Sequence, residues 1–175
     1  MAEIKSTLDL VMEKLKDMEV SEEEKRQFRE KEEREKAQRL FHRYFKGEGR
    51  DWDTLKQQVR KLEGVAREEF LRLVAEEIPL DGTLSDRYAR GLEVVFGPQG
   101  KGRIEEALEG YRRRREARGN ELKAEMLQDL ARRGIKGSAV DPNPRFHPRW
   151  REVMGELERD LRRELHKLLE EIPIS

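Results

Sequence analysis

The chain has 175 residues, of which 43% are charged and 35% hydrophobic, and its 38 basic and 38 acidic residues give a net charge of zero. This apolar fraction is below that of an ordinary globular domain, which predicts thin helical layers, an elongated shape or a partner that covers apolar surface. The absence of cysteine excludes disulfides, thiolate nucleophiles and cysteine-ligated metals. No apolar run is long enough to cross a bilayer and no secretory signal is recognisable, so we expect a cytoplasmic protein with no membrane partner.

Charges of both signs alternate along the chain, a pattern typical of exposed helix faces, and no segment keeps the two-residue period of a strand. The sequence therefore predicts an all-α protein, an elongated bundle of about six helices. Two of them are expected in residues 1–46, as a highly charged N-terminal helical arm or hairpin.

The first predicted helix covers about residues 2–17, where apolar side chains recur every three or four positions as in a coiled coil. The second begins at a capping box made by Ser21 and Glu24 and is expected to end at Gly47 or Gly49. Its first half, residues 22–36, has Phe28 as its only apolar side chain and is therefore expected to be solvated.

Residues 47–175 are predicted to form a helical core, with a single domain over residues 1–175 as the alternative. A third helix is expected over about residues 51–78, because Pro79 disfavours helical geometry in the residue before it. A short fourth helix carries apolar residues between positions 84 and 96, and the glycine-rich stretch 97–102 is expected to break the chain after it.

A fifth helix is predicted over residues 103–133, where Gly119-Asn120 offers a point of division and Gly134 a stop. Residues 135–147 contain prolines and small residues and are predicted to be non-helical, either as a connector or as a segment presented to a partner. Pro148 suits the first position of a last, amphipathic helix over residues 148–172.

The apolar seam of this last helix is the candidate interaction surface. Stripes of this kind are usually intramolecular core, but the low apolar content of the chain favours a seam that faces another molecule. We therefore predict a helical protein–protein interaction or adaptor module that pairs with itself as a homodimer or with another helical protein, through Leu157, Leu161, Leu165 and Leu168.

An RNA- or ribosome-associated protein is the alternative, because clustered arginine is typical of phosphate binding. The residues concerned are Lys101, Arg103, Arg112, Arg113, Arg114, Arg115 and Arg118. Consecutive helical residues point around the helix, however, which argues against a single basic patch. The stretch Gly97-Pro98-Gln99-Gly100 is similar to the GxxG loop of RNA-binding KH domains, but the sheet of that fold has no candidate here.

A third hypothesis is an enzyme whose site forms across a dimer interface. No catalytic residue can be named, because no carboxylate or serine stands out by its neighbours. We predict no cofactor and no metal site, since His42, His147 and His166 lack the spacings of helical metal sites.

Two stretches, Met1-Ala2-Glu3-Ile4-Lys5-Ser6-Thr7-Leu8-Asp9-Leu10-Val11-Met12-Glu13-Lys14 and Arg133-Gly134-Ile135-Lys136-Gly137-Ser138-Ala139-Val140, resemble segments of a family of uncharacterised bacterial proteins. The resemblance implies a bacterial cytoplasmic protein and brings no activity, cofactor or site residue with it.

Overall fold

The computed structural model describes residues 21–80 and 83–175, and within these ranges it contains helices and no strand. The α-helices are α2 (Glu22–Phe41), α3 (Trp52–Arg60), α4 (Gly64–Glu77), α5 (Asp86–Arg132) and α6 (Trp150–Glu171). A π-helical turn, η1 (His42–Lys46), follows α2, and a 3₁₀ turn, η2 (Pro144–Phe146), precedes α6. The helix predicted over residues 2–17 and its apolar seam lie outside the described residues.

Helix α2 begins with the predicted capping box. The Ser21 hydroxyl accepts a hydrogen bond from the Glu24 amide at 3.1 Å, and the Glu24 carboxylate accepts one from the Ser21 amide at 2.8 Å. The following turns are exposed, and Phe28 keeps 61% of its surface in solvent. Burial begins at Ala37, so only the last turns of α2 belong to the core.

The core joins the end of α2, η1, α3, α4, the first part of α5 and the last turns of α6. Its centre is aromatic: Phe41 stacks on Phe45 with ring centroids 5.0 Å apart, and Tyr88 of α5 meets Phe45 edge-on at 4.9 Å. Rings packed in this way add attraction beyond their buried area. Because Phe41 and Phe45 lie in this cluster, the core crosses the domain boundary predicted after residue 46.

The single helix predicted over residues 51–78 is wrong, because two helices occupy this range. Helix α3 ends at Arg60, and α4 starts at Gly64, whose φ of +48° is a backbone conformation that suits glycine. The turn between them places Leu62 in the core. Helix α4 ends at Glu77, before Pro79, as predicted.

The glycine-rich break predicted over residues 97–102 is also wrong in extent. Only Gly97 leaves helical geometry, with φ +72° and ψ 173°, and the helix resumes at Pro98. Proline fits the first position of a helical segment and pushes the preceding residue out of helical geometry, which a glycine tolerates. Helix α5 therefore bends once at Gly97 and then runs without interruption through Gly119 and Asn120 to Arg132, so these two residues do not divide it.

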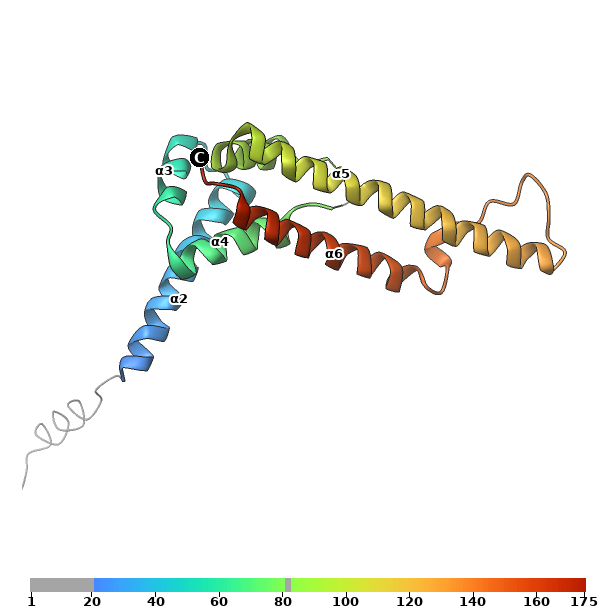
Figure 1. The fold of residues 1–175 in the computed structure, drawn as a ribbon, viewed down its shortest axis with the longest axis horizontal. Coiled ribbons are helices and arrows are strands. Elements are labelled where there is room, and N and C mark those ends of the chain that lie inside the picture. Colours follow the sequence, from blue (N-terminus) through green and yellow to red (C-terminus); the bar gives the residue numbers. More distant parts are fainter. Residues whose placement is uncertain (1–20, 81–82) are drawn as a thin grey trace, which may run out of the picture.

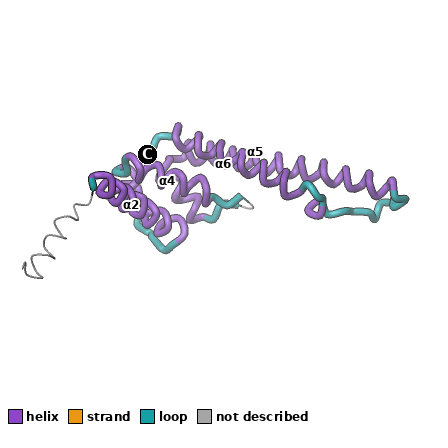
Figure 2. Tube along the Cα trace, turned by 90° about the horizontal axis from the view of Figure 1, so that it is seen from below, coloured by secondary structure: helices purple, strands orange, loops and turns teal. Residues whose placement is uncertain are grey.

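Helices α5 and α6 run side by side and project from the core as a long two-helix arm (Figures 1 and 2). The chain between them, residues 133–149, contains η2 and folds back along α5. An ion pair between Lys123 and Asp141 and a contact of 3.2 Å between the His147 imidazole and Glu125 hold it there. Within the core, the Arg162 guanidinium of α6 donates to the backbone carbonyls of Ala75 and Ile78 at the end of α4.

Candidate functional site

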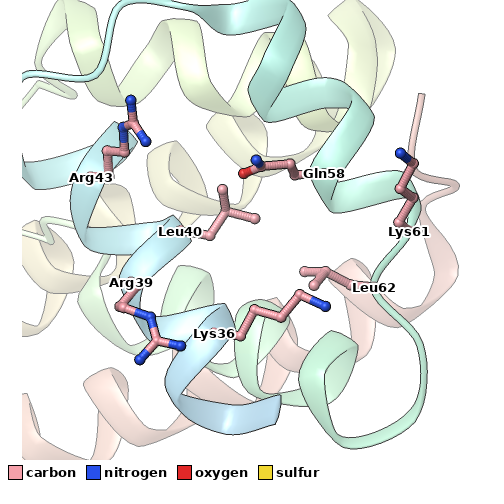
Figure 3. Close-up of a pocket in the computed structure, with 7 residues that line it drawn as sticks. All are labelled: Lys36, Arg39, Leu40, Arg43, Gln58, Lys61 and Leu62. Carbon is pink, nitrogen blue, oxygen red and sulfur yellow. The ribbon is translucent and has the colours of Figure 1, made fainter. Parts of the chain in front are cut away.

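A basic pocket of about 360 Å³ lies between the end of α2 and the end of α3 (Figure 3). Its lining contains four cationic side chains, one amide and two leucines, and no carboxylate: Lys36, Arg39, Leu40, Arg43, Gln58, Lys61 and Leu62. Figure 3 shows Leu40 and Gln58 pointing toward each other in the middle, with Lys61 on the opposite side from the α2 cations. Volumes of this size are typical of small-ligand sites.

Local sequence explains how the pocket forms. Lys36, Arg39 and Arg43 are three or four residues apart, so they lie along one face of α2 and η1 beside Leu40. The π-helical turn closes with a 2.6 Å hydrogen bond from the Gly47 amide to the His42 carbonyl, and π-turns of this kind recur at functional sites. The buried side chains of Leu40 and Leu62 form the apolar part of the lining.

The cations of the pocket are only partly neutralised by their own chain. Lys36 lies 3.9 Å from Glu33 and Arg39 lies 3.5 Å from Glu35, and both pairs are exposed. Among the described residues, no carboxylate lies within 4.0 Å of Arg43 or Lys61. The Arg43 guanidinium instead lies over the Tyr44 ring, 5.6 Å from its centroid.

The positive charge of the pocket affects the pKa of one neighbouring acid, Asp51. Asp51, the N-cap of α3, accepts hydrogen bonds from the Thr54 hydroxyl at 2.6 Å and from the Thr54 amide at 3.0 Å. These bonds lower the pKa of the Asp51 carboxyl, and the positive charge of Arg43 lowers it further. Asp51 is thus committed to capping the helix, and it does not line the pocket.

A second candidate surface lies toward the far end of the arm. Three large apolar side chains are exposed there: Phe146 at 81%, Ile135 at 51% and Leu127 at 36%. Met126 and Leu130 on the same turns of α5 are half-buried. We call these five residues the distal arm surface. The last buried apolar residue on α5 is Leu122, and among the described residues the apolar side chains beyond it remain half-buried or exposed.

The four leucines predicted to bind a partner are packed against other residues of the same chain. Leu161 and Leu165 are fully buried in the core, and Leu157 and Leu168 are half-buried against it. A partner can therefore reach only the latter two without opening the fold.

The predicted nucleic-acid residues are distributed over several faces and largely paired with acids. Carboxylates of this chain lie within 3.6 Å of five of them: Lys101 with Glu105, Arg103 with Glu171, Arg112 with Glu109, Arg114 with Glu164 and Arg118 with Glu121. Arg113 lines a groove of about 500 Å³ toward α6 that also contains three glutamates, whereas Arg115 lines a different one beside Trp150. The structure does not bring these seven residues together as one positive surface.

The described residues also contain one buried acid, Glu69, which is 3% exposed. Its carboxylate accepts hydrogen bonds from the Arg72 guanidinium at 2.8 and 2.9 Å and from the Gln38 amide at 2.8 Å. The bonds from Arg72 lower the pKa of Glu69 to about 2 against the opposing effect of burial. Glu69 is therefore ionised at neutral pH and fixes α2 on α4, which is a structural role.

Across residues 21–80 and 83–175, no three histidine, aspartate or glutamate side chains are placed to hold a metal ion. None of the helices in these ranges combines the length and apolar content that a membrane span requires. Comparison of the chain with family models, with curated proteins and with solved structures finds no match.

Sequence reasoning missed both candidate surfaces. The spacing of Lys36, Arg39 and Arg43 was a signal for the pocket, but the contribution of Lys61 depends on the turn after α3, which the sequence did not predict. Phe146 carried its own signal, because a large apolar residue inside a proline-containing connector has no helix face on which to be buried.

Proposed function

We propose that this protein is a helical interaction module that pairs with a second copy of itself through the distal arm surface. The observation that carries the proposal is the exposure of three large apolar side chains at the distal end of the arm, Leu127 on α5, Ile135 just after it and Phe146 in η2, which the described part of the chain leaves in solvent. Exposed large apolar side chains near one end of an otherwise charged protein are candidates for an interaction site.

A second copy fits this surface by its charge. The charged residues near these apolar side chains carry both signs, with Lys123 and Glu125 toward one end and Asp129 and Arg132 toward the other, and each of them also has a partner in its own chain. A two-fold axis near Met126 would place Lys123 of one copy near Asp129 of the other, and the reverse, as a symmetric interface requires. The zero net charge of the chain also means that two copies approach without long-range repulsion.

Self-pairing would also supply the partner that the low apolar content of the chain predicts, one that covers apolar surface. The two-helix arm has a single layer of buried residues, and beyond Leu122 its apolar side chains remain partly in water. Covering them with the same stripe of a second copy removes apolar surface from water at both arms, at about 25 cal/mol for each Å².

The test is the mass in solution as a function of concentration, by light scattering after size exclusion. We expect the mass of the natural chain to rise from 20.8 kDa toward twice that value. The variant Phe146→Glu/Ile135→Glu should stay monomeric because it places charge in the interface. Phe28→Glu is the matched control, since Phe28 is also exposed but lies on α2. Self-pairing would be refuted if the natural chain stayed monomeric into the hundreds of micromolar. A Phe28→Glu control that became as monomeric as the double variant would also contradict pairing through the distal arm surface.

A further inference from the structure

We infer that the basic pocket binds a small organic anion that carries two or more negative charges in one group, of which a diphosphate is the chemical type. The inference is independent of self-pairing, because the pocket is lined by residues of α2, η1, α3 and the turn after α3. The distal arm surface lies on another part of the molecule, at the far end of the arm formed by α5 and α6 (Figure 1).

The charge of the lining is the first argument. Four cationic side chains from two parts of the chain border the pocket and no carboxylate does, in a protein whose acids and bases are equal in number. Three other grooves of the described surface differ, because each of them contains at least one glutamate. The one between α5 and α6 that contains Arg113 also contains Glu106, Glu164 and Glu171, so a bound anion would be repelled there.

The second argument is that the cations of the pocket can still form ion pairs with a ligand. Arg43 and Lys61 have no carboxylate of the described chain within 4.0 Å, and the pairs of Lys36 and Arg39 are long and solvated. Like charges that surround one space repel each other, and a bound dianion would remove this repulsion and accept hydrogen bonds from guanidinium and ammonium groups.

The shape and polarity of the lining are the third argument. The Gln58 side chain reaches the middle of the pocket and can donate from its amide to a phosphate oxygen (Figure 3). Leu40 and Leu62 offer a small apolar surface on which a carbon skeleton can rest. A few polar groups over an apolar base are typical of small-ligand sites, whereas a nucleic-acid surface would be wider and continuous.

The position of the pocket makes binding measurable. Its walls come from α2, η1, α3 and the turn at residues 61–62, so a ligand would connect α2 to the consecutive elements η1 and α3. Because a ligand that binds only the folded state raises its stability, the midpoint of thermal unfolding should rise with ligand concentration.

The experiment titrates the full chain with inorganic pyrophosphate and, in parallel, with adenosine diphosphate, at constant ionic strength set by sodium chloride. The readouts are the side-chain amide resonances of Gln58 in ¹⁵N-labelled protein and the unfolding midpoint. We expect saturable shifts at Gln58, and the double variant Arg43→Gln/Lys61→Gln should weaken binding by at least about tenfold, because it removes two charge-assisted hydrogen bonds to the anion.

The matched control is Arg67→Gln/Lys31→Gln, which removes the same two charges from exposed positions outside the pocket. Its affinity should stay within about twofold of the natural chain, since screened charges at a distance contribute little. Tighter binding of the nucleotide than of pyrophosphate would support an organic ligand that carries a diphosphate group, whereas equal binding of the two would contradict the organic part of the proposal. The proposal would be overturned if the Gln58 resonances shifted with neither ligand, or if the control variant weakened binding as much as the double variant does. Binding of single-stranded RNA with loss in the double variant but no binding of either small anion would also overturn it.

Discussion

The ring of Phe45 occupies the space in which a side chain on Gly91 would lie. A Cβ built on Gly91 would approach the Phe45 ring carbons to 2.8 Å, closer than real side chains come. Glycine at this position thus allows the first segment of α5 to pack directly on the aromatic centre of the core.

Gly91→Ala should therefore lower the free energy of unfolding by about 1 to 3 kcal/mol, as overpacked cores do. Gly102→Ala is the control, because a Cβ there meets nothing within 4 Å and alanine is the better helix former, so its free energy of unfolding should rise by up to about 1 kcal/mol. Urea unfolding followed by circular dichroism measures both. A tolerated Gly91→Ala would mean that Phe45 is not fixed against α5.

The two buried tyrosines should respond in opposite directions to loss of the hydroxyl. The Tyr88 hydroxyl donates to the Val74 carbonyl at 3.1 Å, whereas the buried Tyr44 hydroxyl has no partner among the described residues. Because an unpaired buried polar group is unfavourable and a paired one contributes, Tyr44→Phe should raise the unfolding free energy by about 1 kcal/mol and Tyr88→Phe should lower it by a similar amount. Equal effects of the two substitutions in chemical unfolding would contradict this assignment.

The Glu69 carboxylate should make stability depend on acid. Its folded pKa of about 2 lies below the ordinary value of 4.5, so the ionised form stabilises the fold fully above about pH 4.5 and the contribution is lost as the pH falls toward 2. Glu69→Gln should lower the unfolding free energy by about 2 kcal/mol at pH 7, after allowance for the partial exposure of Arg72. The difference between variant and natural chain should shrink in unfolding curves recorded between pH 4.5 and pH 2.

A control for this pH dependence is Glu76→Gln. Glu76 also contacts Arg72 but is exposed, and exposed pairs contribute at most about 1 kcal/mol. If Glu76→Gln lowered the unfolding free energy as much as Glu69→Gln does, the stabilisation would come from the charge interactions of Arg72 and not from the burial of Glu69.

Features set by adjacent residues were predictable from the sequence. The capping box is made by Ser21 and Glu24 within four consecutive residues. The stop at Gly134 depends on one positive φ of +82° with a 3.0 Å bond from the Ile135 amide to the Leu130 carbonyl. Both were predicted, because the sequence itself contains the groups that satisfy the helix ends.

Features set by packing between distant residues were not predictable. The sequence predicts Gly100 as part of a break in the chain, but Gly100 is helical and lies at a close contact, because a Cβ there would meet Ile172 at 2.8 Å. Gly119 was interpreted as a helix boundary, whereas it lies in mid-helix opposite Trp150 of α6. A glycine that permits close packing and one that ends a helix look alike in a sequence, and only the neighbouring element distinguishes them.

The candidate sites divide in the same way. The apolar seam of α6 was recognised, but its period does not tell whether another copy or the rest of the same chain covers it, and Leu161 and Leu165 prove to be core. The basic pocket needs Arg43 and Lys61 from separate elements, so its prediction required the turn between α3 and α4.

The most direct test of self-pairing through the arm is a distance between two copies. The chain contains no cysteine, so Gln128→Cys gives one spin-label site on the exposed part of distal α5, and Lys31→Cys gives a control site on α2. Pulsed electron resonance on Gln128→Cys should yield a resolved distance between copies, and Lys31→Cys should yield a longer one or none. No distance between copies at Gln128→Cys, or a shorter one at Lys31→Cys, would contradict pairing through the distal arm surface.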